Sequence, residues 1–283
     1  MRFVATLLMW LVTTILLAVA LPAAWAQQHL VDTDGYAALA QKAASDPALQ
    51  SAMAAELSTQ VVRLGSNVDS SVMSGVAATY TAGSAFPGQF AQANRFAHRW
   101  LFTDAIRSSV DPQGRWVIDF APMLADTSFQ QTLSQYHVTV PSTLPIPLSD
   151  NAPAALRPGV VGPVATWGPW VSVGLALLAG ASAVFTLFIA AKRGKTLAAL
   201  GVSALLVGAS GWAAIELSRD RVNELLNNTS GNIREIAAVM VSTAEKSMHQ
   251  WLNVTLVVGA GLVIIGVIVS LLVSLAGGRA DPD

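Results

Sequence analysis

The chain has 283 residues, of which 53% are hydrophobic and only 12% are charged. A soluble domain carries about 25% charged residues, so this composition is typical of a membrane protein. The net charge of −1 gives no basis for nucleic-acid binding, and the absence of cysteine excludes disulfides, thiolate nucleophiles and cysteine metal ligands.

The N-terminal segment, residues 1–26, fits two descriptions. Ala24-Trp25-Ala26 matches the A-x-A pattern that signal peptidase cuts, but the apolar run Phe3–Leu21 is longer than the ~7–15 residues of a signal-peptide core. We favour an uncleaved first membrane helix. In both cases the chain reaches the outer face of the membrane after Ala26, so the topology that follows does not depend on the choice.

Residues 27–165 are predicted to form an extracytoplasmic α+β domain that is rich in helix. Asp32 or Thr33 can cap a first helix, and Ser45-Asp46-Pro47 is typical of the start of a second. Further helices are expected at 89–106 and at about 127–136. Short strands are expected at 115–120 and 137–140, and the prolines of Thr143–Leu148 allow at most an edge strand.

Two further spans are predicted at 166–191 and 196–216. A helix rises ~1.5 Å per residue, so 20 uncharged residues cross the ~30 Å hydrocarbon core. The connection, residues 192–195, carries Lys192, Arg193 and Lys195. Such basic loops stay in the cytoplasm, which fixes the sidedness of the whole chain.

Residues 217–250 are polar and are predicted to be an extracytoplasmic helical hairpin that turns at Asn227–Gly231. Residues 251–276 form the fourth span, and residues 277–283 a short cytoplasmic tail. The predicted fold is therefore a four-helix membrane bundle in the plasma membrane. Both termini are cytoplasmic, and most of the soluble mass is extracytoplasmic.

Small residues in the spans suggest close helix packing, either within the chain or with a partner. They are Ala176, Gly180, Ala204, Gly208, Gly211, Gly259 and Gly266. Four tryptophans are expected to anchor the chain at the outer membrane interface. These are Trp167, Trp170, Trp212 and Trp251.

The sequence contains no recognisable catalytic, cofactor-binding or metal-binding motif. Its four histidines are dispersed, and no charged residue lies deep within a span. Arg95-x-x-His98-Arg99 could bind an anion, but such a set is more often one solvated face of a helix. We expect a protein that is not an enzyme and has no cofactor.

Several segments in a fixed order resemble an actinobacterial family of integral membrane proteins. They are Leu30–Val62, NRFAHRWLF at Asn94–Phe102, WVIDFAPML at Trp116–Leu124 and LPIPL at Leu144–Leu148. The layout is also similar to accessory subunits of mycobacterial Mce-type lipid importers, which have a claudin-like topology. The chain lacks the tryptophan–cysteine signature of true claudins, so that likeness is architectural.

The resemblance implies a non-catalytic accessory subunit of an envelope transport complex. Its partners would be membrane lipids and other membrane subunits, and not nucleic acid. One alternative is a sensor or lipid-binding module whose extracytoplasmic domain holds a ligand, and a membrane enzyme is a third possibility.

Overall fold

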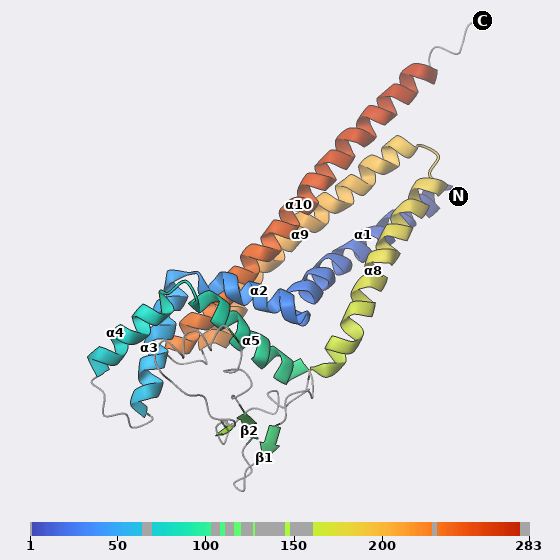
Figure 1. The fold of residues 1–283 in the computed structure, drawn as a ribbon. Coiled ribbons are helices and arrows are strands. Elements are labelled where there is room, and N and C mark those ends of the chain that lie inside the picture. The colour runs from blue at the N-terminus through green and yellow to red at the C-terminus, as the bar shows by residue number, and fades with distance from the viewer. Residues whose placement is uncertain are drawn as a thin grey trace, which may run out of the picture. The chain divides into compact units, whose positions relative to one another are not determined.

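The computed structural model describes residues 2–63, 70–102, 108–110, 116–119, 127, 145–147, 161–227 and 231–277 (Figure 1). The chain divides into two compact units. We call the first the membrane unit; it comprises Met1–Gln27, Pro169–Asn223 and Glu245–Asp283. We call the second the loop unit; it comprises Gln28–Gly168 and Glu224–Ala244.

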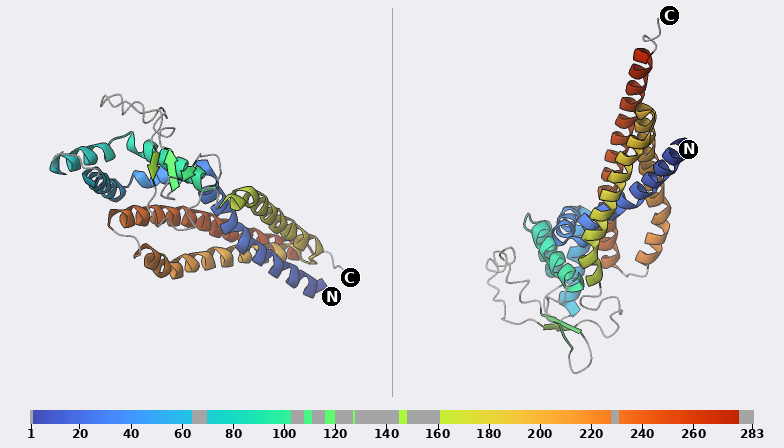
Figure 2. Two further views of the ribbon diagram at one scale, coloured as in Figure 1. Left: turned by 90° about the horizontal axis from the view of Figure 1, so that it is seen from below. Right: turned by 90° about the vertical axis from the view of Figure 1, so that its right-hand side faces the viewer.

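Four helices are long and apolar enough to cross a membrane, so the chain is a multi-pass membrane protein. They are α1 (Arg2–Ala26), α8 (Gly162–Ile189), α9 (Arg193–Asn227) and α10 (Asn232–Gly277). Helices α9 and α10 contain the predicted spans 196–216 and 251–276, α1 matches the predicted 1–26 from Arg2 on, and α8 ends at Ile189, two residues before the predicted end at 191. Within the membrane unit, α9 and α10 lie side by side (Figure 2).

The helices extend further than the apolar runs that identify them. Helix α9 continues to Asn227 and α10 begins at Asn232, so the predicted hairpin at 217–250 consists of the ends of two continuous helices. Glu216 and Arg219 form an i,i+3 ion pair of 2.9 Å on the polar part of α9, which favours helix there. Of the predicted turn at Asn227–Gly231, the structure describes Asn227, which ends α9, and Gly231, whose φ of 62° is one that a residue with a side chain rarely adopts.

The loop unit begins where α1 passes into a π-helix, η1 (Gln27–Val31). Asp32 is the N-cap of α2 (Thr33–Ala44), and its carboxylate accepts a 2.8 Å hydrogen bond from the Gly35 backbone N–H. Pro47 is the first residue of α3 (Pro47–Arg63), as the sequence predicts. Then follow α4 (Ser70–Thr81) and α5 (Phe86–Phe102), which begins three residues before the predicted start at Gln89.

The loop unit has a helical core to which α2, α3, α5 and the first part of α10 contribute. Leu49 is fully buried in it, beside Phe86 and Phe90, whose ring centroids are 5.8 Å apart. Val239 of α10 belongs to the same core. The first turns of the fourth long helix therefore help to form the loop unit, which no periodicity within residues 27–165 could indicate.

The loop unit also contains a small antiparallel sheet of order β1-β2-β3. Its strands are β1 (Ser108–Val110), β2 (Trp116–Asp119) and β3 (Pro145–Pro147). The sequence predicted β2 and the edge position of β3, whereas β1, with two serines in three residues, was not anticipated. The strand expected at 137–140, and all but Thr127 of the helix expected at 127–136, lie outside the described residues.

Candidate functional site

The predicted small residues of α9 and α10 face one another along one seam. A Cβ added at Gly259 would lie 2.9 Å from the Gly201 carbonyl oxygen and 3.0 Å from the Cβ of Ala204. At Gly208 it would lie 2.7 Å from the side chain of Leu256, and at Gly211 and Gly266 it would also meet the opposite helix. These residues therefore pack the chain against itself and are not available to a partner.

Two glycines that the sequence analysis did not single out belong to the same seam. Cβ atoms on Gly194 and Gly201 would lie 2.7 Å and 2.6 Å from α10 backbone atoms. Gly194, Gly201 and Gly208 follow at intervals of seven, as do Gly259 and Gly266. A seven-residue interval keeps successive positions on one side of two helices that cross at a shallow angle. This interval is a sequence signal that places the glycines of each helix on one side, but it does not say which helix they meet.

The small residues of α8 occupy a different environment. Ala176 and Gly180 are exposed within the membrane unit, and a Cβ on Gly180 would have no atom within 4 Å. One interpretation of Ala176 and Gly180 was that they pack against another helix of the same chain. The described structure shows no such packing at these two positions. The buried side of α8 instead carries Ser182 and Thr186.

A polar seam joins α1 to α8 and α9. The Thr13 hydroxyl is 2.7 Å from that of Ser182 and 3.4 Å from that of Thr186, and all three side chains are buried. Thr14 similarly lies 2.8 Å from Ser203 of α9. Hydroxyls in apolar spans commonly hydrogen-bond across helices, so their presence in these spans is a signal that could have predicted the seam from sequence.

The four predicted anchor tryptophans differ in their surroundings. Trp167 and Trp170 of α8 are 65% and 75% exposed. Trp212 stacks on His249 at 3.7 Å between ring centroids, and its indole N–H donates to the Asn253 side chain at 3.2 Å. Trp251 is partly buried. Trp212 thus also joins α9 to α10.

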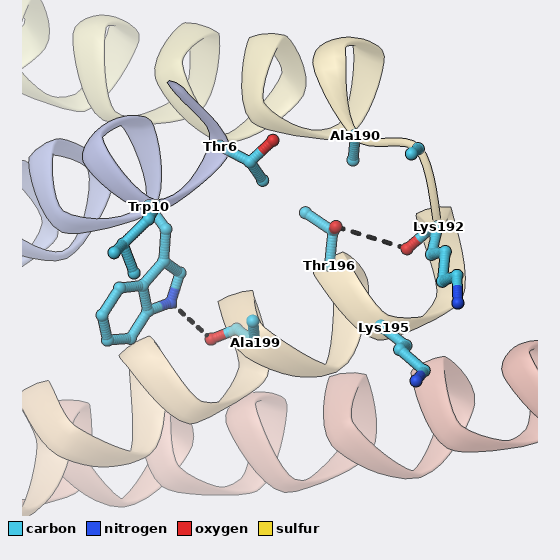
Figure 3. Close-up of a pocket in the computed structure, with 9 residues that line it drawn as sticks. Thr6, Trp10, Ala190, Lys192, Lys195, Thr196 and Ala199 are labelled. Atoms are coloured by element: carbon cyan, nitrogen blue, oxygen red, sulfur yellow. Dashed lines mark hydrogen bonds between the residues drawn. The ribbon is translucent and has the colours of Figure 1, made fainter. Parts of the chain in front are cut away.

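An open pocket of about 630 Å³ lies beside the basic turn between α8 and α9 (Figure 3). Its walls are mainly apolar. Trp10 lies at one end, where its indole N–H donates to the Ala199 carbonyl at 2.8 Å, and Lys192 lies at the opposite end. The pocket is lined by Thr6, Leu7, Trp10, Ala190, Ala191, Lys192, Lys195, Thr196 and Ala199.

The same turn borders a second pocket, of about 580 Å³, on its α10 side. Lys192 and Lys195 line both pockets, and Ser270 and Ser274 of α10 contribute polar groups to the second. The turn therefore presents its cations to two hollows. The sequence identified these cations only as a marker of sidedness.

His98 is a buried titratable group of the described loop unit. It is 4% exposed and stacks on Phe102 at 4.0 Å between ring centroids. One ring nitrogen, Nε2, is 3.0 Å from the Leu30 carbonyl, so it carries the proton in the neutral ring, and Nδ1 accepts from the Thr33 hydroxyl at 3.2 Å. Burial lowers the pKa of His98, although the Leu30 hydrogen bond and the Asp32 charge act in the opposite direction.

The structure does not bring the three residues of the Arg95-x-x-His98-Arg99 set together. Arg95 makes a 2.9 Å ion pair with Asp34 at a polar groove of about 370 Å³, whereas His98 is directed toward Leu30 and Thr33. Arg99 is exposed. Asp34 thus pairs with a cation of α5, and the three residues of the motif have three separate surroundings.

The described residues contain no group of three or more His, Asp or Glu side chains that could hold a metal ion. His98 lies 3.0 Å from the Leu30 carbonyl, and His249 stacks on Trp212. Comparison of the chain with family models, with curated proteins and with solved structures gives no match.

Proposed function

We propose that this protein is a non-catalytic accessory subunit of an envelope transport complex, of the Mce-type lipid importer class. In this proposal the loop unit is an extracytoplasmic α+β domain, both termini are cytoplasmic, and the topology is claudin-like. The protein would act through contacts with other subunits in the membrane and outside it. The resemblance of its segments to the actinobacterial family motivates the choice of complex.

The observation that carries the proposal is the free face of α8. Its exposed residues Val173, Leu177, Val184 and Phe188 recur at helical spacing, with Gly180 between them. Lipid tails can cover such a stripe, but they do not require a glycine. An exposed glycine in a span suits the close approach of another helix, and no described helix of this chain makes that approach.

The basic turn supports the proposed sidedness. Lys192, Arg193 and Lys195 lie within four residues of the connection between two spans. Positive loops of this kind remain on the cytoplasmic side. The loop between the first and second spans would then lie outside the cell, where an importer subunit meets exported partners.

Affinity purification from the native host in mild detergent tests the proposal. We expect the ATPase and permease subunits of one transporter to be recovered with the chain. Gly180→Leu should reduce that recovery, because a leucine at this position would hold α8 away from the helix of the partner subunit. Gly261→Leu is the control: a Cβ added at Gly261 of α10 would also have no atom within 4 Å, but Gly261 is only partly exposed, whereas Gly180 is exposed. Recovery of the chain alone, with lipid as its sole companion, would contradict the proposal.

Gly208→Leu and Gly259→Leu are unsuitable for this test. Both positions contact the opposite helix of the same chain, so a leucine would disturb the fold before it affected a partner. The alternative function, a ligand-binding sensor, calls for an enclosed apolar cavity in the loop unit. The groove at Asp34 and Arg95 is small and polar and already contains an ion pair, so it is not the enclosed apolar cavity that a ligand-binding sensor calls for.

A further inference from the structure

We propose that the pocket between Trp10 and the basic turn binds one anionic phospholipid, with its phosphate at Lys192 and Lys195 and an acyl chain along the apolar wall. The assignment stands on three features of the membrane unit: the shape of the pocket, the charge around it and the direction of α9. It does not depend on the proposed transport complex. A partner-free, purified chain should show it.

The shape of the pocket suits a lipid. It is open to the side, and its volume of about 630 Å³ is in the range of small-molecule sites. Leu7, Trp10, Ala191 and Ala199 provide apolar wall, and the lysines stand at the end away from Trp10 (Figure 3). A ligand that fits must therefore be apolar along most of its length and anionic at one end.

Among the described residues of the membrane unit, the charge around the turn is of one sign. The described carboxylates of the membrane unit are Glu216, Asp220 and Glu245. Glu216 follows Lys195 by 21 residues on the same helix, which corresponds to ~32 Å along its axis. None of the described carboxylates is thus close enough to neutralise the turn, and a bound anion would meet little competition.

The direction of α9 adds to this potential. The helix begins at Arg193, so its first backbone N–H groups have no acceptor one turn earlier and point toward the turn. The helix dipole places partial positive charge at the same end. Cations at a helix N-terminus are unfavourable by themselves, and a phosphate held between them and the N–H groups offsets that cost.

The residues of the turn are held in place without using their ammonium groups. The Thr196 hydroxyl donates to the Lys192 carbonyl at 3.3 Å, and Thr196 is 8% exposed. The Trp10 hydrogen bond to Ala199 fixes the opposite wall. Both lysine side chains are therefore free to turn toward a headgroup while the walls keep their form.

The test uses the purified full chain and native mass spectrometry with phosphatidylglycerol or phosphatidylcholine of identical acyl chains. We expect preferential retention of phosphatidylglycerol. The double substitution Lys192→Gln with Lys195→Gln should lower its apparent affinity by on the order of 10- to 30-fold, because each basic residue near a membrane surface contributes a several-fold effect. Lys192→Arg with Lys195→Arg should keep the preference.

The chain provides a matched control, because its two remaining lysines, Lys42 and Lys246, are exposed and lie outside the pocket. Lys42→Gln with Lys246→Gln removes the same charge and should leave the preference unchanged. Ala191→Phe fills the apolar wall without changing charge and should weaken retention of phosphatidylglycerol. Ala191→Phe therefore tests the pocket even if substitution of Lys192 and Lys195 disturbs the turn.

Soluble glycerophosphoglycerol distinguishes a lipid site from a phosphate site. We expect it to compete poorly, since it lacks the acyl chain that the apolar wall would bind. The proposal is overturned if the two lipids bind equally. It is also overturned if the double substitution of Lys192 and Lys195 by glutamine changes the lipid preference no more than that of Lys42 and Lys246. It is also overturned if Ala191→Phe binds as the unaltered chain does, or if the soluble headgroup competes as well as the lipid.

Discussion

Gly201 of α9 and Gly259 of α10 face each other across the membrane unit, and each occupies the space that a side chain on the other would need. A Cβ on Gly201 would lie 2.6 Å from the Gly259 carbonyl oxygen, and one on Gly259 would lie 2.9 Å from that of Gly201. Real Cβ atoms do not approach backbone oxygen so closely. In lipid, where apolar surfaces gain little by leaving their solvent, such close approach is a main source of helix association.

Gly259→Ala is therefore expected to destabilise the α9–α10 pair. The added methyl would force the backbones apart, and overpacking of this kind costs about 1–3 kcal/mol. Gly261→Ala, two residues further along α10, adds its methyl in open space and should be neutral or stabilising by up to ~1 kcal/mol. Thermal unfolding of the purified protein in detergent measures both. Equal midpoints for the two variants would contradict the seam.

Gly35→Ala should be among the most damaging single methyl additions in the loop unit. Its Cβ would overlap the Gln28 carbonyl oxygen, which belongs to the π-helix η1, so the first turn of α2 could not remain against η1. We expect a loss of at least ~2 kcal/mol in unfolding free energy, as for an overpacked core. Gly75→Ala in α4 meets no atom within 4 Å and is the control for added volume. Limited proteolysis of the loop unit would report the difference.

Thr13 and Ser182 are expected to be energetically coupled. Their hydroxyls are 2.7 Å apart and buried between α1 and α8. A double-mutant cycle with Thr13→Val and Ser182→Ala should give a coupling of about 0.6 kcal/mol, with an upper limit of ~1.7 kcal/mol for membrane hydrogen bonds. Unfolding of the four proteins in the same detergent provides the cycle. Strictly additive effects would show that the contact contributes nothing.

The stability of the loop unit should fall on acidification because of His98. Burial lowers its pKa below the ordinary 6.5, so the unfolded chain binds a proton more readily than the folded one. The contribution of His98 is complete above about pH 6.5 and is lost as the pH falls from there toward the lowered value. His98→Gln should be less stable than the unaltered chain at neutral pH but should lose this pH dependence. The prediction is tested by comparing the unfolding midpoints of His98→Gln and of the unaltered chain at pH 5 and pH 7.5.

Much of the organisation follows from local chemistry in the sequence. Uncharged runs of about 20 residues identify four spans because backbone polar groups in lipid must pair within a helix. The cap at Asp32, the helix start at Pro47 and the strand at Trp116–Asp119 depend on residues close to each other in the chain. Such features need no knowledge of distant partners.

Other features depend on which helices meet, and the sequence could not determine them. Gly180 and Gly259 are both small residues in spans, yet one is open and the other is enclosed by Gly201 and Ala204. Val239 belongs to a core formed largely by residues 40–90, and the lysines of the turn border a hollow whose far wall is Trp10. Packing brings together side chains far apart in the chain, so the tertiary structure alone decided which glycines form a seam and which cations line a pocket.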